Sequence, residues 1–224
     1  MSVTVFVPRD SAALAVGANK VAAAIEREAT ARGLDVTIVR NGSRGMLWLE
    51  VLVEVRTEAG RIAYGPVAPS DVPALFDADF LAGGAHPLCH GETKEIPFLK
   101  GQTRLTFSRC GVTDPLSLDD YRRYQGLKGL EKAIALPPAE IVSQVTNSGL
   151  RGRGGAGFPT GIKWKTVADA KADQKYIVCN ADEGDSGTFA DRMIMEGDPF
   201  VLIEGMVIAG IATGATKGYV YTRS

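Results

Sequence analysis

Short apolar segments alternate with polar ones through the N-terminal third of the chain. β-Branched runs predict strands at residues 3–7, 35–39, 47–56 and 61–64. Residues 11–32 place Ala, Val and Ile on one face at helical spacing, which predicts a helix. Ser70 at an N-cap position, with Pro73 close behind it, predicts a second helix that ends near residue 81.

The resulting order, β-α-β-β-β-α within residues 1–82, indicates a compact thioredoxin-like domain. Residues 83–116 contain Gly and Pro and few periodic apolar positions, so we expect an extended linker there. Residues 117–224 would then form a second domain.

The second domain has the pattern of an α/β fold. Helices are expected at residues 117–124, 126–136, 138–147, 166–172 and 199–215, and strands at residues 176–179 and 219–223. In chain order, the last three elements are the strand at residues 176–179, the helix at residues 199–215 and the strand at residues 219–223. They form a β-α-β unit, which indicates that part of the sheet is parallel. Because the chain stops on the final strand, we expect a fragment of a longer protein, with an incomplete α/β domain.

Composition narrows the class of protein. Apolar residues make up 45% and charged residues 23% of the chain, and the net charge of −1 combines both signs, which disfavours a nucleic-acid or membrane-surface partner. Three cysteines lie far apart, which favours a reducing, cytoplasmic location over a disulfide scaffold. Residues 1–10 do not resemble a signal peptide, and the longest apolar stretch, residues 200–215, is too short to span a bilayer.

One segment, "SGLRGRGGAGFPTGIKWKT" at residues 148–166, is unusually rich in glycine: six of the thirteen residues 149–161 are Gly. Gly152, Gly154 and Gly157 fit the spacing G-x-G-x-x-G, but the preceding segment is helical, whereas a Rossmann fingerprint follows a strand. A Walker loop is also disfavoured, because neither Ser nor Thr follows Lys163.

The residue types in this segment nevertheless suit a nucleotide. Glycines allow the backbone to approach a ligand and to turn several N–H groups toward an anion. Four nearby cations can bind phosphate, and two rings offer flat surfaces; these residues are Arg151, Arg153, Lys163, Lys165, Phe158 and Trp164. The plain alternative is a flexible surface loop, which the mixture of glycines, cations and aromatics disfavours.

A second polar cluster, "CNADEGDSGTFADR" at residues 179–192, follows a predicted strand. Open α/β sheets bind ligands at the carboxyl ends of their strands. Asn180, Asp182, Glu183 and Asp185 would present acceptors that suit ribityl or ribose hydroxyls rather than phosphate. The alternative is that these residues cap helices or face solvent, and it applies most strongly to Asp185 and Asp191.

These two segments closely resemble the flavoprotein family of the NADH-binding subunit of respiratory complex I. The family includes the diaphorase subunits of NAD-reducing hydrogenases and the β subunit of NAD-dependent molybdenum formate dehydrogenases. The resemblance runs from about residue 116 to residue 224. It implies an FMN-binding α/β domain of the complex I flavoprotein type, with FMN on the glycine loop and NAD(H) stacked on the flavin.

The resemblance also implies roles for individual residues. Gly152, Gly154, Gly155 and Lys163 match the FMN-binding loop, to which Arg153 belongs, and Asn180, Asp182 and Glu183 match its other side. Phe158 matches an aromatic that contacts the nicotinamide nucleotide. Asp185 stands where many members carry Glu, and Thr166 stands where a second aromatic often contacts the adenine. No residue is expected to act as a catalytic nucleophile or base.

The N-terminal domain resembles the thioredoxin-like [2Fe–2S] domain of these enzymes but lacks its ligands. Ser43 and Leu47 occupy the positions of one cysteine pair, and residues 11–18 contain no cysteine, so a cluster-free domain is expected. His86, Cys89 and His90 could suggest zinc, but no fourth ligand is near, and we predict no metal site. The family's [4Fe–4S] cluster, expected in the full-length protein, has no matching ligands in this chain.

The implied function is that of a cytoplasmic diaphorase subunit, which passes hydride between NAD(H) and FMN and electrons between FMN and iron–sulfur clusters. The cluster-free N-terminal domain makes formate dehydrogenase the closest resemblance. The implied partners are a molybdenum- and iron–sulfur-containing catalytic subunit and a small [2Fe–2S] subunit.

Three alternatives stay open at this point. One is a hydrogenase diaphorase with a degenerate N-terminal domain, and another is a complex I subunit with an N-terminal extension. A non-catalytic scaffold with a vestigial nucleotide site belongs to a different class, and the intact glycine loop and acidic cluster disfavour it. A conventional Rossmann dehydrogenase is disfavoured by the helix that precedes the loop.

Overall fold

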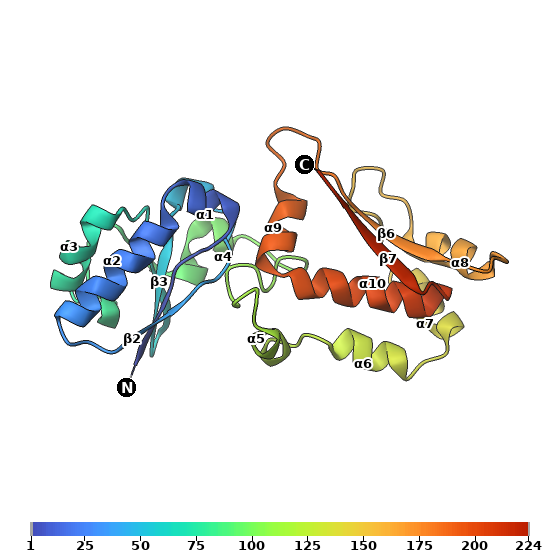
Figure 1. Ribbon diagram of the computed structural model, residues 1–224, viewed down its shortest axis with the longest axis horizontal. Helices are drawn as coiled ribbons and strands as arrows, with labels where there is room; N and C mark the ends of the chain where they lie inside the picture. Colours follow the sequence, from blue (N-terminus) through green and yellow to red (C-terminus); the bar gives the residue numbers. More distant parts are fainter. Residues whose placement is uncertain (1, 224) are drawn as a thin grey trace. The chain divides into compact units, whose positions relative to one another are not determined.

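The computed structural model describes residues 2–223 (Figure 1). The chain divides into two compact units, Met1–Asp120 with Met193–Asp198, and Tyr121–Arg192 with Pro199–Ser224. We call them the N-terminal and the C-terminal unit and describe each by itself. The domain boundaries predicted at residues 82 and 116 stay predictions.

The N-terminal unit is built on a mixed five-stranded sheet. Its strands are β1 (Val3–Phe6), β2 (Val36–Val39), β3 (Val53–Thr57), β4 (Gly60–Tyr64) and β5 (Cys89–Glu92). Their order in the sheet is β2-β1-β3-β4-β5, with β1 and β2 parallel and the other neighbours antiparallel. The longer helices are α1 (Ser11–Ala15), α2 (Ala18–Ala31) and α3 (Val72–Asp77), followed by the single turn α4 (Pro97–Lys100).

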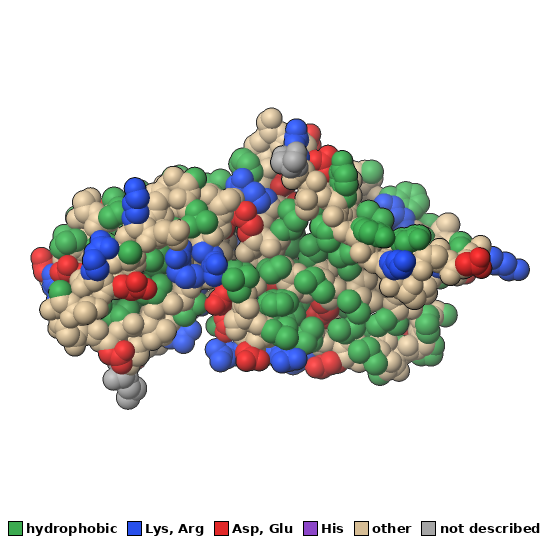
Figure 2. All heavy atoms as spheres, viewed as in Figure 1, with side chains coloured by type: hydrophobic (Ala, Val, Ile, Leu, Met, Phe, Trp, Pro, Cys, Tyr) green, Lys and Arg blue, Asp and Glu red, His purple; other side chains and the backbone are tan. Residues whose placement is uncertain are grey.

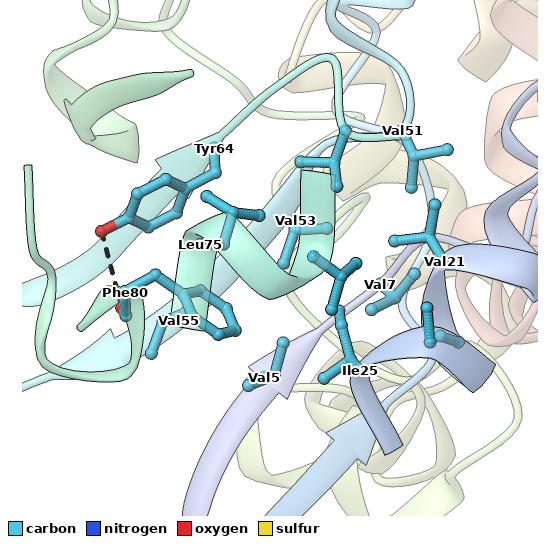
Figure 3. Close-up of a cluster of buried hydrophobic side chains, with 14 of the residues drawn as sticks. Val5, Val7, Val21, Ile25, Val51, Val53, Val55, Tyr64, Leu75 and Phe80 are labelled. Atoms are coloured by element: carbon cyan, nitrogen blue, oxygen red, sulfur yellow. Dashed lines mark hydrogen bonds between the residues drawn. The ribbon is translucent and has the colours of Figure 1, made fainter. Parts of the chain in front are cut away.

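Two helices cover one face of this sheet (Figure 1). Val21 and Ile25 of α2 and Leu75 of α3 pack against the valines of β1 and β3, as Figure 3 shows. Tyr64 and Phe80 meet edge to face beside this cluster, with 5.7 Å between their ring centroids. Burial of this apolar face is the main favourable contribution to the folding of the unit.

Three predictions for this unit were wrong in detail. The helix expected at residues 11–32 is two helices, because the backbone turns at Gly17, whose φ is +100°. Residues Leu47–Leu49 form a 3₁₀ turn instead of the start of a strand. There Met46, Leu49 and Leu52 repeat at a spacing of three, which buries all three side chains in one small cluster with Ile96 and Leu99.

The third correction concerns residues 83–116, which were expected to be irregular, yet they contribute β5 to the sheet. Cys89 lies opposite Tyr64, and Glu92 lies opposite Ile62. The strand is only four residues long and contains Gly91 at φ +74°, so its sequence carries little strand signal. The partner strand β4 therefore determines the conformation of this segment.

The C-terminal unit has a two-stranded parallel sheet with helices around it. The strands are β6 (Tyr176–Ala181) and β7 (Lys217–Thr222), and the helices are α6 (Lys128–Ile134), α7 (Pro138–Asn147), α8 (Thr160–Asp169) and α10 (Pro199–Thr213). The predicted parallel β-α-β unit is confirmed, with Tyr176 opposite Lys217 and Ala181 opposite Thr222. Two further helices, α5 (Leu118–Arg123) and α9 (Ala190–Gly197), include residues of both units.

Two helix predictions need correction here. The helix expected at residues 166–172 begins earlier, at Thr160. Only the glycine loop and Pro159, whose backbone is extended, are non-helical, and the helix starts directly after them. Helix α9 was expected to be a polar loop. Its N-terminal N–H groups are capped by a carboxylate from a distant part of the loop, which local sequence patterns do not reveal.

Helix α10 holds the helical part of this unit together. Its Glu204 carboxylate is buried and accepts hydrogen bonds from the Tyr121 hydroxyl and from the N–H groups of Leu127 and Leu130, the latter two at 2.9 Å. The outer face of α10 is apolar, with Ile203 and Val207 half exposed, and Figure 2 shows apolar side chains gathered over this region.

Candidate functional site

The glycine-rich loop lies between α7 and α8 and is closed at its base. The Gly152 N–H donates to the Phe158 carbonyl, and the Thr160 N–H donates to the Leu150 carbonyl, both at 2.9 Å. Arg151 and Pro159 form an antiparallel bridge between these two hydrogen bonds. The six residues 152–157 therefore form a defined loop whose ends are fixed.

The glycines of this loop differ in what requires them. Gly155 and Gly157 have φ values of +104° and +59°, which disfavour any other residue. Gly161 packs against Thr146, so it is needed for the contact between α8 and α7. Gly154 has neither constraint: its φ lies outside the left-handed region, and a Cβ built on it would meet nothing within 4 Å.

The cations around the loop also differ. Arg151 Nε donates to the Gly157 carbonyl at 2.8 Å, and Lys165 is paired with Asp169 at 2.6 Å. Arg153 makes no hydrogen bond or ion pair within residues 2–223 and is exposed. Lys163 lies 5.7 Å from the ring centroid of Phe158, whose side chain is 46% exposed. Arg153 and Lys163 are therefore positive charges that no carboxylate of the described chain neutralises.

The acidic segment begins where β6 ends. Asn180 Oδ1 accepts a hydrogen bond from the Asp182 N–H at 3.2 Å, which forms a tight turn. The side chains of Asp182 and Asp185 are exposed, and the Asp185 carbonyl accepts from the Thr188 N–H at 3.2 Å. This arrangement leaves the carboxylates of Asp182 and Asp185 accessible.

Glu183 has a different position from its neighbours. Its two carboxylate oxygens accept hydrogen bonds from the N–H groups of Asp191 and Arg192, each at 3.1 Å, so Glu183 caps the start of α9. Burial, and then the nearby Glu183 charge, raise the pKa of Asp191 above its ordinary value. The loop from residue 183 to residue 191 is thus closed by Glu183, as the glycine loop is closed by its backbone pairs.

The structure places both loops in the C-terminal unit, and no hydrogen bond or ion pair between residues 2 and 223 joins one loop to the other. The carboxyl ends of β6 and β7 meet at one edge, where Ala181 lies opposite Thr222. Arg223 follows directly, and its guanidinium lies beside Gly184, since a Cβ on Gly184 would be 3.4 Å from Arg223 Nη1. Sequence reasoning missed Arg223, although its position directly after the last strand could have indicated it.

The possible metal ligands of the N-terminal unit all have structural contacts. His90 Nε2 lies 2.8 Å from the Gly65 carbonyl, His86 Nδ1 accepts from the Leu88 N–H at 3.2 Å, and Cys89 lies in β5. Ser43 Oγ donates to Glu50 at 2.6 Å. Within the described residues, no group of three or more His, Cys, Asp or Glu side chains is arranged to hold a metal ion.

Among residues 2–223, none of the helices combines the length and the apolar character that crossing a bilayer requires.

Comparison with known proteins gives these loops a family context. Residues 145–224 match the family model of the Nuo51 FMN-binding domain. This segment includes both loops, and the match supports the predicted cofactors, FMN and NAD(H).

Several curated proteins are similar to the same part of the chain. HndC, a subunit of the NADP-reducing hydrogenase of Solidesulfovibrio fructosivorans, is 56% identical over 125 residues, which are 56% of this chain and 25% of that protein. One subunit of the NADH-quinone oxidoreductase of Aquifex aeolicus is 51% identical over 57% of this chain and 30% of its own length. The alpha subunit of the NAD-reducing hydrogenase HoxS of Cupriavidus necator is 49% identical over 42% of this chain and 16% of its own length. The chain thus spans less than a third of the length of these relatives.

Proposed function

We propose that this chain carries the FMN- and NAD(H)-binding part of a diaphorase, a flavoprotein that moves hydride between NAD(H) and FMN. The observation that carries the proposal is Gly154. Nothing in the fold requires glycine there, because the backbone is unstrained and the space beyond it is empty. A ligand that must approach the backbone closely would require it. FMN fits this loop, because the backbone N–H groups of the loop and the unpaired cations beside it would bind the phosphate of FMN.

Each residue then has a task that its surroundings suit. Arg153 and Lys163 would attract and hold the phosphate, because neither is paired with a carboxylate in the described chain. Phe158 would offer its exposed ring to the nicotinamide nucleotide. Asn180 and Asp182 would accept hydrogen bonds from ribityl hydroxyls, and the shorter Asp185 would lie near the nicotinamide nucleotide.

Glu183 would act indirectly, by holding the loop of residues 183–191 in place, because both of its carboxylate oxygens already cap α9. When bound, FMN would supply the hydride chemistry and the conversion to single-electron steps. The side chains of this chain would bind and orient the two nucleotides, and we assign none of them as nucleophile or general base. Their contribution is positioning and electrostatics.

At a finer level we propose coupling to formate oxidation in a cytoplasmic complex. The support is the N-terminal unit, which we propose to be thioredoxin-like and free of a cluster, since Ser43 and Leu47 replace the expected cysteines. The partners would be a molybdenum- and iron–sulfur-containing subunit and a small [2Fe–2S] subunit. The relatives are named as hydrogenase and NADH-quinone oxidoreductase subunits, and both remain competing assignments.

An absorption spectrum tests the proposal. The chain is reconstituted with FMN under anaerobic conditions and mixed with NADH, with NADPH as the comparison because one relative is named NADP-reducing. We expect a bound flavin band that bleaches with NADH. A chain that takes up no flavin would favour the scaffold alternative. Adding formate or hydrogen to the complex with its partner subunits then distinguishes the finer assignments.

A further inference from the structure

We propose that Arg151 is a positioning residue: its guanidinium holds the glycine loop in the conformation that receives phosphate, and it leaves the anion contact to Arg153 and Lys163. The inference rests on the proposed function and assigns different tasks to two neighbouring arginines. Sequence reasoning had counted both as phosphate ligands.

The support begins with the hydrogen bonds at the base of the loop. Two backbone hydrogen bonds and one bridge join its two ends, and they involve only residues before Gly154 and after Gly157. Arg151 adds a contact from a side chain, the 2.8 Å hydrogen bond from its Nε to the Gly157 carbonyl. This contact reaches further into the loop than the backbone pairs do.

The loop needs such a contact because of its composition. Four of the six residues 152–157 are glycine, and glycine loses more conformational freedom on ordering than any other residue. Gly157 must also be held at φ +59°. A charged donor makes a stronger hydrogen bond than a neutral one, and the rigid guanidinium orients the carbonyl that it binds.

Arg151 and Arg153 carry the same charge but differ in their hydrogen bonds. Arg151 Nε is bound to a backbone carbonyl, whereas Arg153 has no hydrogen bond or ion pair in the part of the chain that is described. Loss of Arg151 should therefore reduce the order of the loop at any ionic strength. Loss of Arg153 should reduce the attraction for phosphate, and this attraction weakens as salt screens it.

Titration of the complete chain with FMN, followed by flavin fluorescence at low and at high salt, separates these tasks. We expect Arg151→Met to weaken binding about tenfold at both salt concentrations, and Arg151→Lys to recover part of the loss. Arg153→Met should weaken binding mainly at low salt. Lys171→Met removes an exposed charge outside the loop and should bind FMN like the wild type.

Amide hydrogen exchange without FMN gives an independent measurement. In Arg151→Met the N–H groups of Gly152 and Thr160 should exchange about tenfold faster, and in Arg153→Met they should exchange at the wild-type rate. Unchanged exchange in Arg151→Met would overturn the inference, and so would a loss of FMN affinity that disappears at high salt. If the wild type binds no FMN, the proposed function fails, while the exchange rates still decide whether Arg151 holds the loop.

Discussion

Two glycine- and arginine-containing loops in this chain have similar compositions and opposite surroundings. In residues 42–45 of the N-terminal unit, Gly42 is packed against Gly197, and Arg44 is paired with the buried Glu54 at 2.6 Å. In the loop of residues 149–161, Gly154 faces empty space and Arg153 has no partner among the described residues. The groups of the first loop are bound within the protein, whereas the described surroundings of the second loop require neither Gly154 nor the charge of Arg153, and we assign both to the proposed ligand.

The comparison also bears on the missing cluster ligands. Ser43 stands where a cysteine was expected in a cluster-binding relative, and its hydroxyl donates to Glu50 and accepts from the Gly45 N–H at 3.0 Å. The loop around it is therefore held by its own hydrogen bonds. We propose that it has become purely structural.

The largest expected effect concerns the paired charges of the N-terminal unit. Glu54 is fully buried and bonded to both Arg44 and Arg61. Glu54→Gln should lower the free energy of unfolding by about 3–5 kcal/mol, because it removes the charge of a buried carboxylate that is bonded to two guanidinium groups. Urea denaturation measures the loss. Glu95→Gln breaks an exposed pair with Lys100 and should leave the unfolding midpoint unchanged.

A matched pair of glycine substitutions separates packing from ligand binding. Gly42→Val should destabilise the protein by about 1–3 kcal/mol, because its Cβ would lie 2.8 Å from the Gly197 backbone. Gly154→Val should leave stability within about 0.5 kcal/mol. It should nevertheless weaken FMN binding by about a hundredfold or more, because the side chain would fill the space of the ligand.

Thermal melts and FMN titrations on the two variants provide the measurements. The contrast between the two loops would be wrong if Gly154→Val unfolded the protein, or if it bound FMN with the affinity of the wild type.

A pH effect is expected from the N-terminal unit. Burial raises the pKa of Glu50 to about 7, although hydrogen bonds from Ser43 and the Leu52 N–H act in the opposite direction. The folded state then holds a proton that the unfolded state releases near pH 4.5. Stability from this group is present below about pH 4.5 and is lost as the pH rises through about 7, a decrease of about 3 kcal/mol.

Urea denaturation at a series of pH values checks this expectation. Glu50→Gln should remove the decrease between pH 4.5 and 7, because an amide does not titrate in this range. An identical pH dependence in the variant and the wild type would exclude Glu50 as its source.

The smallest expected effect concerns the unpaired cations. Arg153→Met and Lys163→Met should each weaken FMN binding about fivefold at low salt and reduce its salt dependence, because each removes one charge near the phosphate. Riboflavin, which lacks the phosphate, should bind both variants and the wild type equally. An equal loss of affinity for riboflavin would show that these side chains do not act on the phosphate.

Sequence patterns predicted the parts of the fold whose signal is local. Helix α7 begins at Pro138 and ends at Asn147 as expected, and the parallel pairing of β6 with β7 is confirmed. Non-local features were missed, because β5 depends on its pairing with β4 and α9 on a cap from Glu183. Only the structure distinguishes the free Gly154 from the constrained Gly155 and Gly157, although all three read alike in the sequence.

The most direct test of the account is a comparison of FMN and riboflavin in binding to the complete chain, measured by quenching of flavin fluorescence. The account predicts saturable binding of FMN and much weaker binding of riboflavin, since the open glycine loop and its unpaired cations are assigned to the phosphate. Equal affinity for the two flavins, or binding of neither, would contradict it.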